Sequence, residues 1–336
     1  MHPLEQQVLA NWPQQLTPNL SYQVGLSGGV DSVVLLHILH QIKHLITDTT
    51  TFTLTAAHIN HGISVNAATW EKFCSNYCRT LGIELHIIQH KVTKLGGESL
   101  ENNARQIRYQ AFFKSSADVI ILAHQQNDQV ETTLSQIFRG SDLHNIASMQ
   151  ELSQKHNKLI FRPLLGISRQ QIENYAHDYQ LNYITDESNS DTTYLRNFIR
   201  HEIIPKLNTF DKNIDGKVLK LPHQLQKLLA LVDEVAASDF ANTKGEYNPI
   251  LPHEFGSNPR MTILLIDKFS ALSEQRQINV LVYFLKQQQL PLPTAKQLNE
   301  FIRQALTSTW DKEPQLIVDK DHILTKMKQF IAINRK

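Results

Sequence analysis

The residues with the clearest chemical potential form a glycine-rich loop near the start of the chain. Its six residues are Ser27, Gly28, Gly29, Val30, Asp31 and Ser32. A β-rich run precedes them, and an apolar stretch at helical spacing follows. Adjacent glycines let a ligand approach the backbone, and the N–H groups at a helix start attract phosphate. We therefore expect a phosphate-binding loop with Asp31 as a candidate magnesium ligand; an ordinary glycine-rich turn is the alternative.

A second polar segment, residues 58–62, ends the next β-rich run with the letters HINHG. Loops at the carboxyl ends of strands form the ligand crevice of a doubly wound sheet, so we expect His58 to bind adenosine. The alternative is zinc ligation by His58 and His61 together with Cys74 and Cys78. Both cysteines lie on the apolar stripe of an expected helix, which favours core positions for them.

Two carboxylates three residues apart, Asp128 and Glu131, follow His124 and a further β-rich run. At this spacing they share one face of a helix, where a pair of carboxylates is suited to binding an ammonium group. The alternative is that they only complement the positive N-terminal end of the helix. We expect Asp128 and Glu131 to be functional.

Arginines in two segments are candidates for neutralising phosphate charge. Arg105 and Arg108 lie three residues apart in an expected helix, and Arg196 lies in the polar-to-basic segment 186–201. A guanidinium group stabilises negative charge that develops on a phosphate in a transition state. Surface ion pairing is the alternative for these arginines, and a solvated charged helix is the alternative for 186–201.

Alternating β-rich and helical segments predict the fold. Helical patterns between the strands predict an α/β fold with a doubly wound, mainly parallel sheet and helices on both faces. From residue 208 onward the pattern becomes mainly helical, so we expect a catalytic domain over 1–212 and a smaller, mainly helical domain over 213–336. The expected strands are Tyr22–Leu26, Phe52–Ile59, Ile83–Gln89, Val119–Ala123 and Leu159–Arg162.

Composition narrows the class of protein. The chain has 336 residues, 41% of them hydrophobic, and a net charge of +1, so it can bury a large core but has no overall basic field. Nucleic-acid binding would depend on local basic patches. No stretch approaches the ~20 apolar residues that span a bilayer, and Met1–Asn11 does not resemble a secretory signal. With only two cysteines, we expect a cytoplasmic protein without a membrane partner; its oligomeric state is open.

In their order along the chain, these segments resemble the tRNA(Ile)-lysidine synthetases over residues 1–205. The loop at 27–32 is similar to the SGGxDS signature of PP-loop ATP pyrophosphatases, which cleave ATP between the α and β phosphates. The segments at 162–169 and 186–205 distinguish the synthetases from other PP-loop enzymes. The matching letters are SGGVDS, HINHG, the E-x-x-A-R-x-x-R-Y run, LAHQQNDQVET, RPLL with SR, and DESNSDTTYLRNFIRHEIIP.

The resemblance implies a reaction in two steps. ATP would adenylate the C2 oxygen of the wobble cytidine in the CAU anticodon of an isoleucine tRNA, and the ε-amine of free L-lysine would then displace AMP. It also implies pyrophosphate and Mg²⁺ binding by the loop 27–32 and lysine binding by Asp128 and Glu131. The candidates for catalysis or for neutralising phosphate are His124, Arg105 and Arg196.

The sequence departs from the family pattern at two places. The family often has His-His-x-Asp-Asp where residues 124–128 read HQQND, and arginine where this chain has Phe198. The roles of Gln125, Asn127 and Phe198 are therefore undefined. Beyond Asp215 the likeness is weak. Longer members carry a further C-terminal domain, so for a chain ending at Lys336 we expect tRNA recognition to rely on the core and on 213–336.

Two other readings remain open. One is another PP-loop adenylating enzyme, of the amidotransferase or tRNA-thiolating type; thiolating relatives generally need reactive or cluster-binding cysteines. The other is a nucleotide-binding RNA module without chemistry, which would have no need of Asp128 and Glu131.

Overall fold

The structure, a computed structural model, falls into two compact units, residues 1–224 and 225–336. The assignment of catalysis to 1–212 and of tRNA contact to 213–336 stays a prediction. Residues 100–106 are described by their backbone alone. The described residues are 1–17, 19–46, 52–60, 62, 66–89, 100–155, 158–185, 192–247, 261–309 and 312–335.

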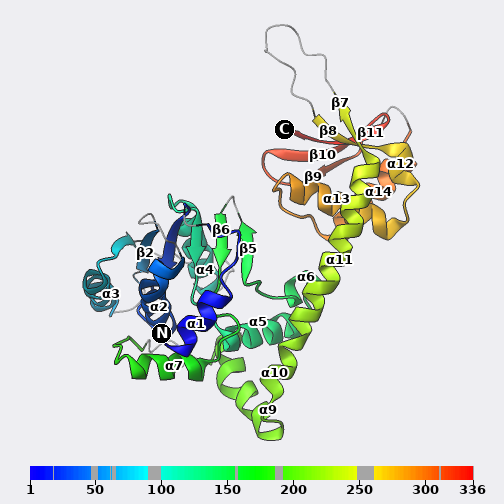
Figure 1. Cartoon of the computed structure of the whole chain (residues 1–336). Helices are drawn as coiled ribbons and strands as arrows, with labels where there is room; N and C mark the ends of the chain where they lie inside the picture. The colour runs from blue at the N-terminus through cyan, green and yellow to red at the C-terminus, as the bar shows by residue number, and fades with distance from the viewer. Residues whose placement is uncertain are drawn as a thin grey trace, which may run out of the picture. The chain divides into compact units, whose positions relative to one another are not determined.

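A six-stranded sheet forms the centre of the first unit, in the order β3-β2-β1-β4-β6-β5 (Figure 1). Every neighbouring pair is parallel except β5 with β6. The predicted parallel sheet is thus confirmed, while the antiparallel edge strand β5 was not predicted. The bounds are β1 Ser21–Gly25, β2 Thr53–Asn60, β3 Glu84–Gln89, β4 Val119–Ile121, β5 Leu152–Lys155 and β6 Lys158–Phe161.

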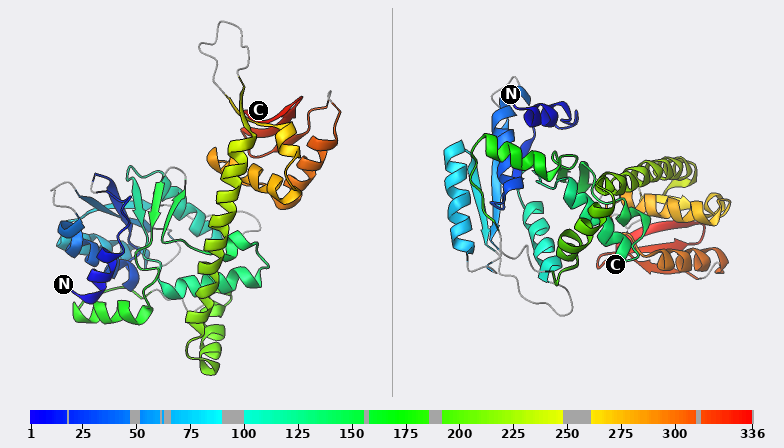
Figure 2. Two further views of the ribbon diagram at one scale, coloured as in Figure 1. Left: turned by 45° about the vertical axis from the view of Figure 1, so that its right-hand side comes forward. Right: turned by 90° about the horizontal axis from the view of Figure 1, so that it is seen from below.

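Helices cover both faces of this sheet, as the sequence predicts (Figures 1 and 2). The alternation of side chains along β4 explains why two hydrophobic clusters form. Val119 and Ile121 belong to a cluster with residues of α1, α2, α3 and α7, whereas Ile120 packs with Phe112 of α4. The bounds are α1 Pro3–Ala10, α2 Val30–Ile46, α3 Ala67–Leu81, α4 Leu100–Phe113 and α7 Arg169–Asp178.

A further group of helices extends the first unit beyond the sheet. A small cluster joins α5 to the segment after residue 194, because Val130 and Leu134 of α5 pack with Ile199 and Ile204. This packing holds the residues around Ile199, which include Arg196 and Arg200 of the basic segment, beside α5. The bounds are α5 Gln126–Phe138, α6 Leu143–Ile146, α8 Leu195–Phe198, the π-helix η2 Ile199–Ile203, α9 Ile204–Phe210 and α10 Ile214–Val218.

The second unit combines helices with a five-stranded antiparallel sheet, in the order β7-β8-β11-β10-β9. Phe284 of α13 and Phe301 of α14 pack against Leu324 and Ile331 of this sheet. The helices were predicted, but the sheet was not. The bounds are α11 Lys220–Thr243, α12 Ile266–Ser270, α13 Glu274–Gln287, α14 Ala295–Thr307, β7 Lys244–Tyr247, β8 Met261–Leu265, β9 Gln315–Ile317, β10 His322–Met327 and β11 Phe330–Arg335.

Among the described residues, no helix is both long enough and apolar enough to cross a membrane.

Candidate functional site

The glycine-rich loop joins β1 to α2 and is ordered by its own serines. The hydroxyl of Ser32 accepts from the backbone N–H of Ser27 at 3.2 Å and donates to the carbonyl of Gly29 at 2.9 Å. Gly28 has φ +91°, a conformation that other residues rarely adopt, and a Cβ there would lie 2.8 Å from Ile184 Cδ1. The loop therefore requires glycine at position 28 for both its backbone angle and its packing.

His58 contacts the backbone at the start of the loop. The residue is 4% exposed, and its Nδ1 lies 2.9 Å from the carbonyl oxygen of Leu26, the residue before the loop. A carbonyl oxygen only accepts, so Nδ1 carries the proton and Nε2 is the nitrogen left with a lone pair. His58 thus supports the backbone that enters the loop. Adenosine contact by His58 stays a prediction, and His61 lies outside the described residues.

The two cysteines are packed into the core, as the sequence predicts. Both are free and buried, and Cys74 Sγ lies 3.4 Å from His58 Nδ1. Burial raises the pKa of Cys74 to about 12 and that of Cys78 to about 11. A neutral thiol is a poor nucleophile and a poor metal ligand. Within the described ranges, no three His, Cys, Asp or Glu side chains are grouped to hold a metal ion.

Asp31, in the first turn of α2, is paired with an arginine from α7. Arg169 Nη1 donates to both carboxylate oxygens of Asp31, at 3.2 and 2.9 Å, and Arg169 Nε donates to Glu173 at 2.7 Å. Burial raises the pKa of Asp31 to about 6, against the opposing charge of Arg169. Asp128 also raises this pKa and Arg200 lowers it, which places both groups within electrostatic range of the loop.

Asp128 takes part in the capping box of the helix that carries it. Its Oδ2 accepts from the backbone N–H of Gln125 at 2.9 Å, and the Gln125 side chain accepts from the N–H of Asn127 at 2.7 Å. Asp128 therefore does complement the N-terminal end of its helix, which was the alternative role considered from the sequence. Its second oxygen is available for an ion pair. Gln125, where the family pattern is broken, serves as the N-cap of α5.

Two arginines form ion pairs with the carboxylates of α5. Arg196 Nε lies 2.8 Å from Glu131 and its Nη2 lies 2.5 Å from Asp128. Arg200 binds Glu131 through two nitrogens, at 2.6 and 2.9 Å, and lies 3.8 Å from Asp128. The side chain of Glu131 is 1% exposed, whereas that of Asp128 is 15% exposed. Asp128 is therefore the more accessible carboxylate, and Glu131 mainly fixes the two guanidinium groups.

Arg169 and Arg200 were not among the predicted site residues. Arg200 follows Arg196 by four residues, the spacing of one helical face, and this is the sequence signal that would have found it. No local pattern links Arg169 to Asp31, since 138 residues separate them. Phe198, between the two arginines of the basic segment, is 41% exposed.

Strand order brings the predicted groups to one edge of the sheet. The loop 27–32 follows β1, His58 lies in β2 and His124 follows β4, and these three strands are parallel neighbours. The carboxyl ends of neighbouring parallel strands share an edge, which is where α/β sheets bind ligands. Arg105 lies in α4, and its side chain is outside the part of the chain that the structure describes.

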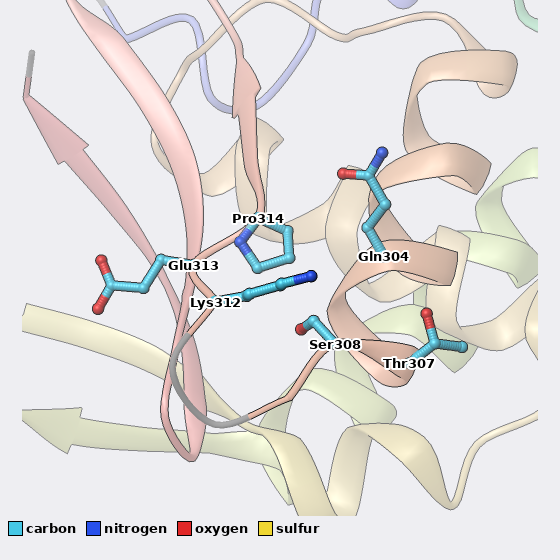
Figure 3. A pocket seen from close by; sticks show the side chains of 6 residues that line it. All are labelled: Gln304, Thr307, Ser308, Lys312, Glu313 and Pro314. Carbon is cyan, nitrogen blue, oxygen red and sulfur yellow. The ribbon is translucent and has the colours of Figure 1, made fainter.

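A separate hollow of about 470 Å³ lies in the second unit, at the C-terminal end of α14 (Figure 3). The side chain of Lys312 extends across it toward α14, whereas that of Glu313 points away. Hydroxyl, amide and ammonium groups suit contacts with phosphate or sugar. Its lining residues are Gln304, Thr307, Ser308, Lys312, Glu313 and Pro314.

The parallel sheet with a glycine-rich loop after its first strand defines an α/β nucleotide-binding class. Residues 4–207 match the family described as PP-loop domain, and the chain belongs to that family. Residues 264–323 match the family described as TilS substrate binding domain.

Several curated relatives share one name. The chain is 36% identical over 312 residues to "tRNA(Ile)-lysidine synthase" of Nitrosomonas europaea, and 37% identical over 297 residues to the protein of that name from Neisseria meningitidis serogroup B. These alignments cover 92% and 86% of this chain. The chain spans 64% of the length of each relative. The resemblance expected from the sequence is thereby confirmed.

A solved structure shares the fold. The U34-tRNA thiolase NcsA from Methanococcus maripaludis superposes with a TM-score of 0.56 at 17% identity, over 67% of this chain and 78% of that one. At this identity the likeness concerns the fold alone.

Proposed function

We propose that this chain is a tRNA(Ile)-lysidine synthetase, which joins free L-lysine to C2 of the wobble cytidine in a CAU anticodon at the expense of ATP. One observation carries the proposal: a PP-loop lies at the same edge of the sheet as a cluster of two carboxylates and two arginines. The cluster consists of Asp128, Glu131, Arg196 and Arg200. The electrostatic influence of Asp128 and Arg200 on Asp31 supports a single site. The name shared by the curated relatives supports this choice of reaction.

In the first step, the C2 oxygen of the cytidine attacks the α-phosphorus of ATP. A bond from that oxygen to phosphorus forms, the bond from the α-phosphorus to the bridging oxygen breaks, and pyrophosphate leaves. The N–H groups and hydroxyls of residues 27–32 bind the departing phosphates. Arg196 and Arg105 neutralise the charge that develops on phosphorus-bound oxygens.

Magnesium fits the loop as a partner of the nucleotide. Asp31 offers one carboxylate, and Mg²⁺ is commonly bound through one or two carboxylates together with substrate phosphates. We infer that Asp31 holds Mg²⁺ only when ATP supplies the other oxygens. The ion would neutralise charge on the pyrophosphate.

In the second step, the ε-amine of lysine attacks C2 and AMP leaves with the former C2 oxygen. Asp128, the more exposed carboxylate, binds the lysine ammonium through Oδ1, the oxygen that also accepts from Arg196. Glu131 keeps Arg196 and Arg200 in place beside it. His124, between β4 and α5, is the candidate that removes a proton from the ε-ammonium and so generates the neutral amine that attacks C2.

The tRNA contacts are assigned to both parts of the chain. Arg196 and Arg200 pair with Asp128 and Glu131, and the second unit carries the match to a substrate binding domain. We propose that residues 213–336 contact the tRNA while residues 1–212 perform catalysis in the cytoplasm.

The buried thiols argue against a thiolating enzyme. Sulfur transfer needs a thiolate or a cluster ligand, and burial keeps Cys74 and Cys78 protonated at neutral pH. An ammonia-using synthetase or a non-catalytic RNA module remain the other outcomes of the test below.

The direct test incubates the purified protein with ATP, radiolabelled lysine and total tRNA. The proposal predicts covalent lysine attachment that needs both ATP and an isoleucine tRNA with a CAU anticodon. Release of AMP with ammonia and without RNA would identify the ammonia-using class instead. RNA binding without AMP release would identify a module without chemistry.

A further inference from the structure

Arg169 occupies the carboxylate that magnesium would need. Its Nη1 donates to both oxygens of Asp31, at 3.2 and 2.9 Å. Its Nε donates to Glu173 at 2.7 Å, so the guanidinium group lies between two carboxylates from different helices. The side chains of Arg169 and Asp31 are 42% and 27% exposed, so solvent and ligands can reach the pair.

The fold fixes this arginine beside the loop. Arg169 is the first residue of α7, and Ser168 caps the helix by accepting from the N–H of Gln171. Tyr175 of α7 is fully buried, and its hydroxyl lies 2.8 Å from His37 Nδ1 of α2. The helix that begins with Arg169 is therefore locked to the helix that begins beside Asp31.

Mg²⁺ would compete with Arg169 for this carboxylate. Mg²⁺ binds carboxylate oxygens directly, and these are the oxygens to which Arg169 donates. We propose that Arg169 is a positioning residue that holds Asp31 until nucleotide arrives and is then exchanged for the metal ion. The inference rests on the proposed function only in assigning ATP and Mg²⁺ to the loop. Glu173 keeps the arginine in place after the exchange, so that its other nitrogens become available to the phosphates.

A metal titration tests the exchange without catalysis. The protein is saturated with an ATP analogue whose α–β bridging oxygen is replaced by methylene, and Mn²⁺ binding is followed by electron paramagnetic resonance. Arg169→Ala removes the competing cation, so we expect the half-saturating Mn²⁺ concentration to fall about two- to fivefold, the range for a partly exposed ion pair. Arg169→Lys is expected to give a smaller fall.

Glu173→Gln serves as the matched control, for which we expect the half-saturating Mn²⁺ concentration to change in the opposite direction. This substitution removes the second carboxylate of Arg169 and one nearby negative charge, so we expect a higher half-saturating Mn²⁺ concentration. An unchanged or raised value in Arg169→Ala would overturn the proposal. If circular dichroism shows that Arg169→Ala is unfolded, Arg169→Lys and Glu173→Gln decide: shifts in opposite directions support the exchange, and equal or absent shifts refute it.

The lysine-attachment assay on the wild-type protein separates this inference from the proposed function. The titration contains neither tRNA nor lysine. Opposite metal shifts with no lysine attachment would contradict the proposed reaction and leave the exchange standing. Lysine attachment with no shifts would contradict the exchange alone.

Discussion

Asp31 lies in surroundings that favour its protonated form. Burial raises its pKa from 3.8 to about 6, although Arg169 opposes the rise. A carboxyl group whose pKa is raised on folding lowers the free energy of unfolding as the pH rises above its pKa in the unfolded chain, because the folded state then holds a proton that the unfolded state has lost. That loss is absent below about pH 4 and complete above about pH 6. Ionised Asp31 therefore makes the protein less stable but gives the loop a charged group that can bind a metal ion. Such a loss of stability is common at functional sites.

Substituting Asp31→Asn should stabilise the protein while abolishing activity. The variant lacks the ionisation penalty, so we expect its free energy of unfolding to exceed that of the wild type by about 1–3 kcal/mol at pH 8. The gain should shrink as the pH falls from 6 to 4. Urea denaturation at several pH values measures it, and a variant less stable than wild type at pH 8 would contradict the explanation.

Asp118→Asn provides a control of opposite sign. Hydrogen bonds from the backbone and hydroxyl of Ser21 lower the pKa of Asp118. Its contribution to stability is present above the pKa of the unfolded chain and is lost as the pH falls. This variant should be less stable than wild type at pH 8, and the difference should vanish in acid.

The thiols of Cys74 and Cys78 should resist alkylation in the folded protein. Their raised pKa values leave almost no thiolate at pH 8, and both side chains are buried. We expect iodoacetamide to label them at least a hundredfold more slowly than in urea, as an order-of-magnitude consequence of the shift. Rapid labelling of the native protein at pH 8 would reopen the thiolating alternative.

At the scale of elements, the loop between β1 and α2 depends on glycine at one position. We expect Gly28→Ala to weaken ATP binding at least tenfold, because the added Cβ adopts an unfavourable φ and meets Ile184. Gly166→Ala is the matched control, since its Cβ would meet no atom within 4 Å. Calorimetric titration with ATP compares the two, and equal affinities would show that the loop conformation is not needed for nucleotide binding.

Local patterns predicted the elements better than the contacts between them. The strands at 22–26, 119–123 and 159–162 and the cap at Ser168 follow from apolar runs and capping residues, which act within a few positions. The pairing of Arg169 with Asp31 and of Arg200 with Glu131 joins segments far apart in the sequence. Packing of whole elements creates these pairs, and no pattern within one segment encodes them.

At the scale of the whole molecule, the second unit holds the largest departure from expectation. Its hairpin of β10 and β11 turns at Lys328-Gln329, which lacks the Asn-Gly or Asp-Gly pair that marks a two-residue turn. The strands β7 and β9 are only four and three residues long. Short strands joined by turns without typical turn residues give little alternation of apolar and polar residues. The sequence therefore predicted the flanking helices but not the sheet.

The hollow beside α14 allows a test of the second unit in tRNA binding. Lys312→Ala should weaken tRNA binding about two- to fivefold and reduce its salt dependence by about one phosphate contact, with ATP affinity unchanged. Glu313→Gln should not weaken tRNA binding, because it removes a negative charge from the same segment. Filter binding at several salt concentrations provides the measurement. An unaltered salt slope in Lys312→Ala would exclude this hollow from the tRNA contact.

The central claim is that the loop at Asp31 and the carboxylate Asp128 serve successive steps in one site. The measurement that tests it most directly follows label from [α-³²P]ATP into tRNA in the presence of lysine. Asp128→Asn should adenylate the tRNA but fail to bind lysine, so labelled tRNA accumulates, whereas Asp31→Asn should give none. If Asp128→Asn instead transfers lysine at the wild-type rate, or forms no labelled tRNA at all, the division of roles between the two carboxylates is wrong.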